Sequence, residues 1–401
     1  MEHSTSTTHQ VLAGVRVLDF GRYIAGPYCA ALLADLGADV IRIERVTGGE
    51  DRSVMPVGKD GVGALFLAMN RNKRGMTLDP ASSAGREIVR KLVATADVVI
   101  ANLPPDVLHS LALDLASLQA IKPDIILTMV TAFGAGGPWS HKHGFDGVGQ
   151  VMSGAAYLTG TPDQPLRATV PWVDFGTALY SAFGTLAALL ARTQTGSGQK
   201  VEAALLQTAL AFNNALLLEQ QVIATNREAT LNRGYTSAPS DIYRTQDGWI
   251  VVGTVGNPMF ARWAKLIGED AWISDPRFND DAARGTHGEL ISARMTQWTL
   301  ARTTTQALAE LERATIPAAP LYSPQQALDD AHIQATGFLL DTDYPGLPRA
   351  APIAPLPVNL SATPGQFQHR APLLGEHTED ILRELGYDAA AIAALRLAHA
   401  I

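Results

Sequence analysis

The first 130 residues alternate strand and helix signals, and this order constrains the fold more than any other feature of the sequence. Strand-like runs rich in β-branched and aliphatic residues stand at 15–20, 39–44, 97–100 and 124–130. Helices are expected between them at 27–36, 83–96 and 105–119. Strands that alternate with helices favour a parallel sheet with helices on its faces. The sequence therefore predicts an α/β fold in this part of the chain.

The pattern changes at about residue 241. Strand-like runs at 242–244 and 249–252 flank the turn residues Gln246, Asp247 and Gly248, which predicts a β-hairpin. Helical segments follow as far as about residue 313. Together these elements indicate a second, smaller α+β domain.

Two connecting regions flank the smaller domain. Before it, a long helix is expected over 205–225, and the polar stretch 226–240 is typical of a linker. After it, prolines are frequent between residues 345 and 372, where we expect an extended segment. A final helix is expected at 376–385.

Composition and charge exclude several classes of protein. The formal net charge of −8 argues against a nucleic-acid-binding surface. The single cysteine, Cys29, lies in an apolar run, so we expect a buried thiol, no intrachain disulfide and a reducing cytoplasm. The N-terminus lacks the pattern of a secretory signal. The most apolar stretch, 175–191, is interrupted by glycine and hydroxyl residues, which favours a core helix over a membrane span.

Asp174 stands immediately before that apolar stretch, between Trp172, Val173 and Phe175. One interpretation is structural, because aspartate is a preferred N-cap and contributes about 1 kcal/mol there. The other is chemical, because apolar neighbours would partly desolvate the carboxylate while the helix N-terminus would keep it ionised. The two interpretations are compatible, since a cap would also fix a nucleophile in position.

The turn after the first strand reads GRYIAGP at 21–27 and leads into a helix. Such a loop can bind a phosphate or a carbonyl oxygen through free N–H groups, but it can equally be a tight turn that packs a helix on a sheet. It does not contain G-x-G-x-x-G. Glu44, at the end of the second strand, lies where dinucleotide folds place a ribose-binding acid, which leaves a nicotinamide-dependent alternative open.

Basic residues cluster near the ends of the second and third strands. They are Arg42, Arg45, Lys73 and Arg74. They are typical either of a phosphate site or of an ordinary solvated charge cluster. A metal site is not expected, because His141 and His143 share a loop without a third ligand at a suitable spacing.

The order of several segments resembles the class III CoA-transferases, the family that includes formyl-CoA transferase, carnitine CoA-transferase and α-methylacyl-CoA racemase. The segments cover nearly the whole chain: LAGVRVLDFGRYIAGP, LADLGADVIRIER, NRNKRGMTLD, ADVVIANLPP, FGAGGP, GFDGVGQVMSGAAYLTG, VDFGTALYSAFGTLAALLAR, TGSGQKVEAALLQTAL, DGWIVV, DPRF and APLLGEHTEDIL. The resemblance implies a Rossmann-like large domain built from both ends of the chain, 1–200 and 316–401. It also implies a linker helix region at 201–240, a small domain at 241–315 and an interlocked homodimer.

The resemblance assigns roles to individual residues. The catalytic aspartate of the family falls on Asp174. The residues that would line a CoA tunnel are Tyr23, Ile24, Ala25, Arg45, Lys73, Arg74 and Asn102. A lysine of formyl-CoA transferase falls on His143, and Asp146 would orient the acceptor or shape the pocket. Racemases of the family carry G-H-D where this chain reads Gly144-Phe145-Asp146, and Phe145 cannot move a proton.

The resemblance implies a CoA-transferase that moves CoA from an acyl-CoA to a carboxylic acid through an aspartyl-CoA thioester on Asp174. CoA and acyl-CoA would be substrates, with no permanently bound cofactor. Backbone N–H groups at 21–25 and 133–137 would stabilise the oxyanions. Oxalate is not the expected acceptor, since Ile24 and Phe145 favour a larger or less polar acid. The alternatives are an acyl-CoA racemase on the same fold and a CoA-binding protein without chemistry.

Overall fold

The computed structural model describes residues 10–58 and 61–401. Its internal contacts divide the chain into two compact units. The first unit comprises Met1–Ser153, Ala168–Leu218 and Thr336–Ile401, and the second comprises Gly154–Arg167 and Glu219–Ala335. The first unit is therefore built from both ends of the chain.

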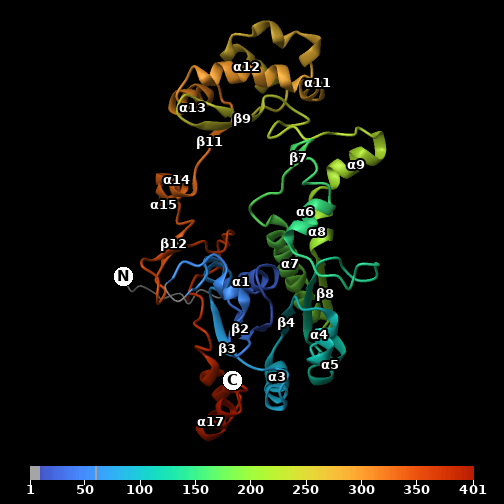
Figure 1. Cartoon of the computed structure of the whole chain (residues 1–401), viewed down its shortest axis with the longest axis vertical. Helices are drawn as coiled ribbons and strands as arrows, with labels where there is room; N and C mark the ends of the chain where they lie inside the picture. Colours follow the sequence, from blue (N-terminus) through green and yellow to red (C-terminus); the bar gives the residue numbers. More distant parts are fainter. Residues whose placement is uncertain (1–9, 59–60) are drawn as a thin grey trace. The chain divides into compact units, whose positions relative to one another are not determined.

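The first unit is organised around a six-stranded sheet in the order β3-β2-β1-β4-β5-β8. Its strands are β1 (Arg16–Asp19), β2 (Asp39–Glu44), β3 (Lys73–Thr77), β4 (Val98–Ala101), β5 (Ile126–Thr131) and β8 (Lys200–Ala204). Every neighbouring pair is parallel (Figure 1). The predicted α/β fold with a parallel sheet is confirmed, and this strand order is that of doubly wound nucleotide-binding folds.

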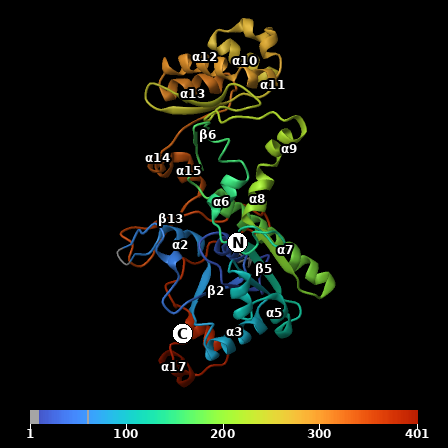
Figure 2. The same cartoon turned by 45° about the vertical axis from the view of Figure 1, so that its right-hand side comes forward.

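Helices cover both faces of the sheet because consecutive strand residues point in opposite directions. Val17 and Val40 pack on one face against α1 (Ala25–Asp35) and α7 (Trp172–Thr195), and Figure 2 shows α7 beside β5. Cys29 lies in this layer and is fully buried, as predicted. Helix α7 is long and apolar enough to cross a membrane, but half of its most apolar window is buried, and it serves as a core helix here.

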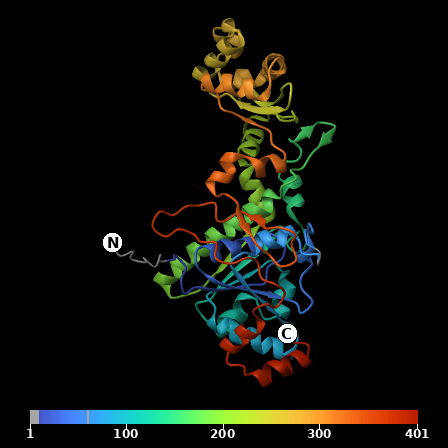
Figure 3. The same ribbon diagram turned by 90° about the vertical axis from the view of Figure 1, so that its left-hand side faces the viewer.

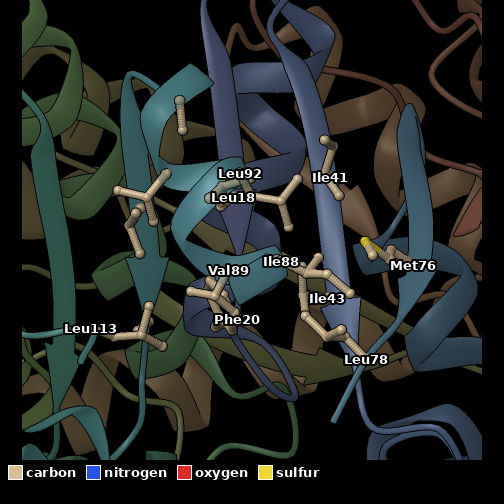
Figure 4. Packing of buried hydrophobic residues seen from close by; sticks show 14 of the residues in the cluster. Leu18, Phe20, Ile41, Ile43, Met76, Leu78, Ile88, Val89, Leu92 and Leu113 are labelled. Carbon is tan, nitrogen blue, oxygen red and sulfur yellow. The ribbon is translucent and has the colours of Figure 1, made fainter. Parts of the chain in front are cut away.

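The other face carries the largest hydrophobic cluster. Leu18 and Ile41 pack there against residues of α3 (Ser83–Thr95), such as Ile88 and Leu92 (Figure 4). The C-terminal helices α16 (Thr378–Glu384) and α17 (Ala389–Leu397) return to this face, together with α5 (Leu115–Ile121) (Figure 3). Each fully buried Leu or Ile stabilises the fold by roughly 1.5–3 kcal/mol. The end of the chain is therefore part of the core of the first unit.

The second unit has its own core and a three-stranded antiparallel sheet, β11-β10-β9. The predicted hairpin is confirmed as β9 (Ser240–Arg244) and β10 (Trp249–Gly253), and β11 (Ala318–Pro320) pairs with β10. The covering helices are α10 (Asn257–Ile267), α11 (Asp281–Thr286), α12 (Gly288–Leu300) and α13 (Thr304–Arg313), coloured yellow to orange in Figure 1.

The remaining described elements are short. The helices are α2 (Ala64–Met69), α4 (Pro105–Ser110), α6 (Asp146–Met152), α8 (Leu205–Phe212), α9 (Asn214–Ile223), α14 (Pro324–Asp329) and α15 (Ala331–Thr336). The two-stranded pairs are β6 (Gly160–Thr161) with β7 (Gln164–Pro165) and β12 (Leu340–Thr342) with β13 (Ala351–Ile353). The 3-10 turns are Glu50–Ser53, Asp270–Ile273 and Pro276–Phe278.

Three helix predictions need correction. The helix expected over 105–119 is divided into α4 and α5, because Ala112 adopts the left-handed conformation, which ends a helix. The helix expected over 205–225 is divided into α8 and α9 at Asn213, whose side chain donates to the carbonyl of Ser153. The helix predicted at 376–385 is not the last, since α17 follows it.

Candidate active site

A cavity of about 320 Å³ lies within the first unit where the carboxyl ends of β1, β4 and β5 meet. The chain leaves β1 toward one edge of the sheet and β4 toward the other, so the cavity occupies the topological switch point at which such sheets bind ligands. Its lining residues come from the loops after these strands, from 140–145 and from α7. They are Arg22, Tyr23, Ile24, Ala25, Asn102, Leu103, Pro104, Pro105, Val130, Thr131, Ala132, Ser140, His141, Lys142, His143, Gly144, Phe145, Asp174 and Leu205.

The loop after β1 is held by side chains on both sides. Asn102 accepts a hydrogen bond from the N–H of Arg22 and donates one to its carbonyl, each at 2.8 Å. Asp19 accepts from the N–H of Gly21 at 2.8 Å. A Cβ on Gly21 would lie 2.8 Å from Asp19 and from Pro27, so only glycine fits there. The loop is thus a tight turn and also a wall of the cavity.

Tyr23 lies at the tip of this loop in the left-handed conformation, with φ of 63°. Such a backbone costs on the order of 1–3 kcal/mol for a residue with a Cβ, and the surrounding structure must hold it. Its ring contacts Phe145 edge to face at 5.7 Å. Phe145 is 66% exposed although it is large and apolar. The two rings therefore form an apolar wall that is open to solvent in this chain.

Asp174 lies in the first turn of α7, but it does not cap the helix. The helix begins at Trp172, and its N-cap, Pro171, makes no side-chain cap hydrogen bond. The cap comes from α6 instead: Asp146 accepts from the N–H of Val173 at 2.8 Å and, more weakly, from that of Asp174 at 3.3 Å. The predicted N-cap role of Asp174 is wrong, because a carboxylate distant in sequence takes that role and leaves the Asp174 side chain to the cavity.

The carboxyl group of Asp174 is unusually basic. Burial and the nearby charge of Asp146 raise its pKa to about 7. The neighbours of Asp174 in the sequence are apolar and packed: Val173 is fully buried, and Phe175 packs edge to face on Tyr28. We expected the helix N-terminus to keep this carboxylate ionised. Here the loss of water and the second carboxylate outweigh the helix dipole, so both protonation states are present near neutral pH.

The glycine-rich region contributes to the cavity differently from the expectation. Residues 140–145 line it, including His143, whereas residues 133–137 do not. The N–H of Gly134 is already used by the hydroxyl of Thr131. Oxyanion donors are therefore best sought at the start of α1, where the first N–H groups of the helix have no partner within it.

Arg45 lies outside this cavity. It lines a neighbouring pocket of about 100 Å³, which shares Arg22 and Leu103 with the cavity. Its guanidinium is about half exposed and pairs with Glu50 at 2.5 Å. Arg45 is thus an accessible cation at the carboxyl end of β2, on the same edge of the sheet.

The structure does not bring Lys73 and Arg74 to the cavity, and we correct their expected role. The Lys73 ammonium is fully buried and donates to Asp19, Asn70 and the carbonyl of Pro27, so no donor remains for a ligand. Arg74 binds Asp39 and Glu384 at the amino end of the sheet, opposite the cavity. Both residues precede the strand end from which a ligand could be reached.

Glu44 gives no support to a nicotinamide site. It is buried and accepts two hydrogen bonds from Arg52, at 2.9 and 2.6 Å. Arg42 is buried as well, where it donates to Asp51 and to the carbonyl of Gly21. Neither side chain of this strand is free to bind a ribose hydroxyl or a phosphate.

Sequence reasoning did not single out two residues that shape the site. Gln150 is buried and hydrogen-bonded to Asp146, and Lys142 lines the cavity with its ammonium 3.8 Å from the centre of the Trp139 ring. The signal for Gln150 was its place one helical turn after Asp146. Nothing in the local pattern marks Lys142.

Comparisons with known proteins agree with this geometry. Residues 12–378 match the family described as CoA-transferase family III. The chain is 34% identical over 379 residues to a succinyl-CoA–D-citramalate CoA-transferase of Chloroflexus aurantiacus, covering 93% of this chain and 94% of that protein. It is 33% identical over 386 residues to a succinate–glutarate CoA-transferase of Agrobacterium fabrum, covering 93% and 95%. The crystal structure of a CaiB/BaiF family protein from Brucella suis superposes with a TM-score of 0.82 at 32% identity, over 94% of this chain and 99% of that one.

Proposed function

We propose, from the premise that this chain belongs to CoA-transferase family III and moves CoA between carboxylic acids, that Asp174 is the nucleophile of the transfer. The observation that carries the proposal is a half-buried carboxyl group on a helix tip, facing a cavity at the switch point of the sheet, with its pKa raised to about 7. A carboxylate that has lost much of its hydration is a stronger nucleophile than one in water.

The reaction begins when a carboxylate oxygen of Asp174 attacks the thioester carbonyl of the donor acyl-CoA. The C–S bond breaks, CoA leaves as a thiolate, and a mixed anhydride remains on Asp174. The thiolate then attacks the aspartyl carbonyl carbon, which releases the donor acid and leaves an aspartyl-CoA thioester. The acceptor carboxylate attacks the carbonyl of this thioester, the C–S bond breaks, and CoA thiolate leaves a second mixed anhydride on Asp174. The thiolate then attacks the acceptor carbonyl carbon, which forms the product acyl-CoA and releases the carboxylate of Asp174. Over the whole exchange one thioester is consumed and one is formed, so the energy of the thioester is conserved and no ATP is consumed.

The walls of the cavity fit this sequence. The N–H groups at the start of α1, near Ile24 and Ala25, are placed to stabilise an oxyanion beside Asp174. Tyr23 and Phe145 offer an apolar wall against which the carbon chain of an acyl group can pack. Phe145 carries no ionisable group, so the chain lacks a second base for racemisation at this position.

We place the pantetheine arm in the cavity and the nucleotide end of CoA toward the neighbouring pocket. That pocket shares Arg22 with the cavity, and Arg45 offers an exposed guanidinium for a phosphate. Asn102 acts there by holding the loop at Arg22, since its amide group already makes two hydrogen bonds to that residue's backbone. His143 is a second side chain on the cavity wall that can meet the CoA chain.

For the substrates, we propose acids larger than oxalate. The apolar wall of Ile24, Tyr23 and Phe145 favours a carbon chain over a compact dianion. Lys142 and His141, on the same cavity wall, can meet a second carboxylate. Dicarboxylates of the size of succinate and glutarate, both named for the Agrobacterium fabrum relative, fit both requirements.

We further propose that the enzyme is a cytoplasmic, interlocked homodimer. Helix α9 contains no buried residue although its sequence is largely apolar. Large apolar side chains are also exposed on α7, among them Tyr180, Phe183 and Leu190. Apolar surface of this kind marks a protein interface. Light scattering at micromolar concentration should give twice the mass of the 42.6 kDa chain.

The test of the nucleophile is a trapping experiment. The enzyme is mixed with succinyl-CoA and then with hydroxylamine, which converts an activated aspartyl group to a hydroxamate. We expect the modification on the peptide that contains Asp174 and nowhere else, together with CoA exchange into added glutarate. Asp174→Ala should lose both while it still binds CoA in a calorimetric titration. Near-normal exchange in this variant would exclude the proposed mechanism.

A further inference from the structure

Asp146 and Gln150 form a buried bracket beside the nucleophile. They lie one turn apart on α6 and are 5% and 1% exposed. Asp146 Oδ1 accepts from the N–H of Val173 at 2.8 Å and from that of Asp174 at 3.3 Å. Gln150 Nε2 donates to Asp146 Oδ2 at 2.5 Å, and Gln150 Oε1 accepts from the N–H of Ala168 at 2.7 Å. The bracket therefore joins the loop before α7 to the first turn of that helix.

Capping alone does not require a charge at this position. A serine, threonine or asparagine caps a helix about as well as an aspartate. A buried carboxylate is costly unless a cation or several hydrogen bonds compensate it. Within residues 10–58 and 61–401, neither Asp146 nor Asp174 forms an ion pair, so the charge of Asp146 is compensated by neutral hydrogen-bond donors. A negative charge that costs stability beside a reactive carboxylate points to a chemical role.

We propose that Asp146, supported by Gln150, is a positioning residue that fixes the carboxylate of Asp174 toward the cavity and keeps it strongly nucleophilic. This inference rests on the proposed role of Asp174 as nucleophile. Asp146 accepts from the N–H groups of the helix tip, so the Asp174 side chain does not fold back to accept from them. Its charge also disfavours the ionised form of Asp174, which makes that carboxylate more basic.

The other charged or titratable groups near Asp174 are Arg22 and Tyr23 on the loop after β1 and His141, Lys142 and His143 before α6, all of which line the cavity. Tyr28 on α1 contacts the ring of Phe175. The shift in the pKa of Asp174 has burial as its first cause and Asp146 as its second, and no cation contributes to it. Asp146 is thus the one charge in the described chain that this shift depends on.

The test replaces the charge and keeps the shape. In Asp146→Asn the remaining carbonyl oxygen can still accept from the helix N–H groups. We measure the rate of hydroxamate formation on Asp174 against pH, at saturating succinyl-CoA. We expect the acid limb of the pH–rate profile to move to lower pH by about one unit. The rate at pH 8.5 should fall by about threefold, because the nucleophile is less basic.

A second variant distinguishes charge from packing. In Asp146→Asn the new amide group would face the donating amide of Gln150, so Asp146→Asn with Gln150→Glu restores an acceptor and returns one negative charge to the bracket. We expect this pair to move the acid limb part of the way back. Asp388→Asn makes the same change at the N-cap of the remote helix α17. It should leave the acid limb of the pH–rate profile and the rate of hydroxamate formation unchanged. A purely structural bracket would lower the rate equally at every pH, and that result would overturn the proposal.

The outcome for the bracket can be separated from the outcome for the proposed function. If the unmodified enzyme forms no adduct on Asp174, the proposed function fails, and the bracket is then tested by thermal unfolding alone. Because Asp174 has a raised pKa in the folded state, its ionisation reduces stability between about pH 4 and 7. Asp146→Asn should make this loss smaller. An unchanged dependence of Tm on pH would contradict the influence of Asp146 on Asp174.

Discussion

Two groups of buried carboxylates in the first unit have opposite electrostatic surroundings. Beneath the loop after β1, the acids Asp19, Glu44 and Asp51 are matched by three cations, Lys73, Arg42 and Arg52. At the tip of α7, Asp146 and Asp174 lie together with hydrogen-bond donors but without a cation. The first group is compensated and the second is not.

The compensated group supports the loop. Lys73 donates to Asp19 at 2.7 Å, and Asp19 accepts from the N–H of Gly21. Arg42 donates to the carbonyl of Gly21 at 3.0 Å. Burial lowers the pKa of Lys73 to about 8, against the opposing effect of Asp19, and three hydrogen bonds satisfy its ammonium. These contacts fix a backbone whose next residues, including the left-handed Tyr23, line the cavity.

The uncompensated group contains the proposed nucleophile, Asp174. When a buried carboxyl group without a neighbouring cation ionises, the free energy of unfolding falls. The same poor stabilisation of the negative charge makes the carboxylate a better nucleophile. The comparison teaches that burial of charge has two uses in this enzyme. Where a counter-charge is present the carboxylate supports a loop, and where it is absent the pKa of the carboxyl is raised, as the proposed nucleophile requires.

The largest expected effect comes from Asp174→Asn. It removes the nucleophile but keeps its shape, so we expect CoA exchange to fall by about 10³-fold or more. Stability should change in the opposite direction. The folded pKa of Asp174 is raised, so the wild type loses stability from about pH 4 up to pH 7, and the neutral amide avoids this loss. At pH 8 the variant should be more stable by on the order of 1–3 kcal/mol, measured by urea unfolding.

Asp388→Asn is the control for that change, because Asp388 caps a helix at the surface and has no part in the cavity. It should leave exchange intact and should not add stability. If Asp174→Asn were inactive and also less stable than the wild type, ionised Asp174 would not cost stability. The two groups of carboxylates would then not differ in the way described.

The second effect comes from Lys73→Met. It leaves Asp19 buried with an N–H donor but no counter-charge, so we expect a loss of about 3–5 kcal/mol in the free energy of unfolding. Urea unfolding at pH 7 measures it. Arg90→Ala removes a cation from an exposed pair with Glu87 and should have no measurable effect. A loss below about 1 kcal/mol for Lys73→Met would show that the group beneath the loop is not held together by its charges.

Local sequence pattern was sufficient for the sheet and insufficient for the site. Strand β2 was predicted with both of its ends, because an apolar run follows Gly37 and the register of a parallel sheet buries it on both faces. The position of Asp174 at the tip of a core helix also followed from the apolar run after it. The fold of the first unit was therefore accessible from residues that are neighbours in the chain.

The pairing of charges was not accessible in that way. The family resemblance placed Lys73 at the CoA tunnel, but its ammonium binds Asp19, which is 54 residues away in the sequence. One of the two interpretations of Asp174 was that it caps α7 itself, whereas the cap comes from Asp146, 27 residues before Val173. Both errors have the same cause. A side chain distant in the sequence makes the hydrogen bond or ion pair, and the periodicity of the sequence does not predict such a contact.

The smallest of these effects is a titration, and it separates the two groups of carboxylates most directly. Attack requires the ionised form of Asp174, so the rate of hydroxamate formation should be half-maximal near pH 7 and should fall tenfold for each pH unit below that. Saturating succinyl-CoA keeps substrate binding from contributing, and a separate titration of CoA affinity over the same range provides the control. If the midpoint lay near pH 4, the carboxyl of Asp174 would be as well stabilised as an ordinary solvated acid. The absence of a cation beside it would then have no chemical consequence.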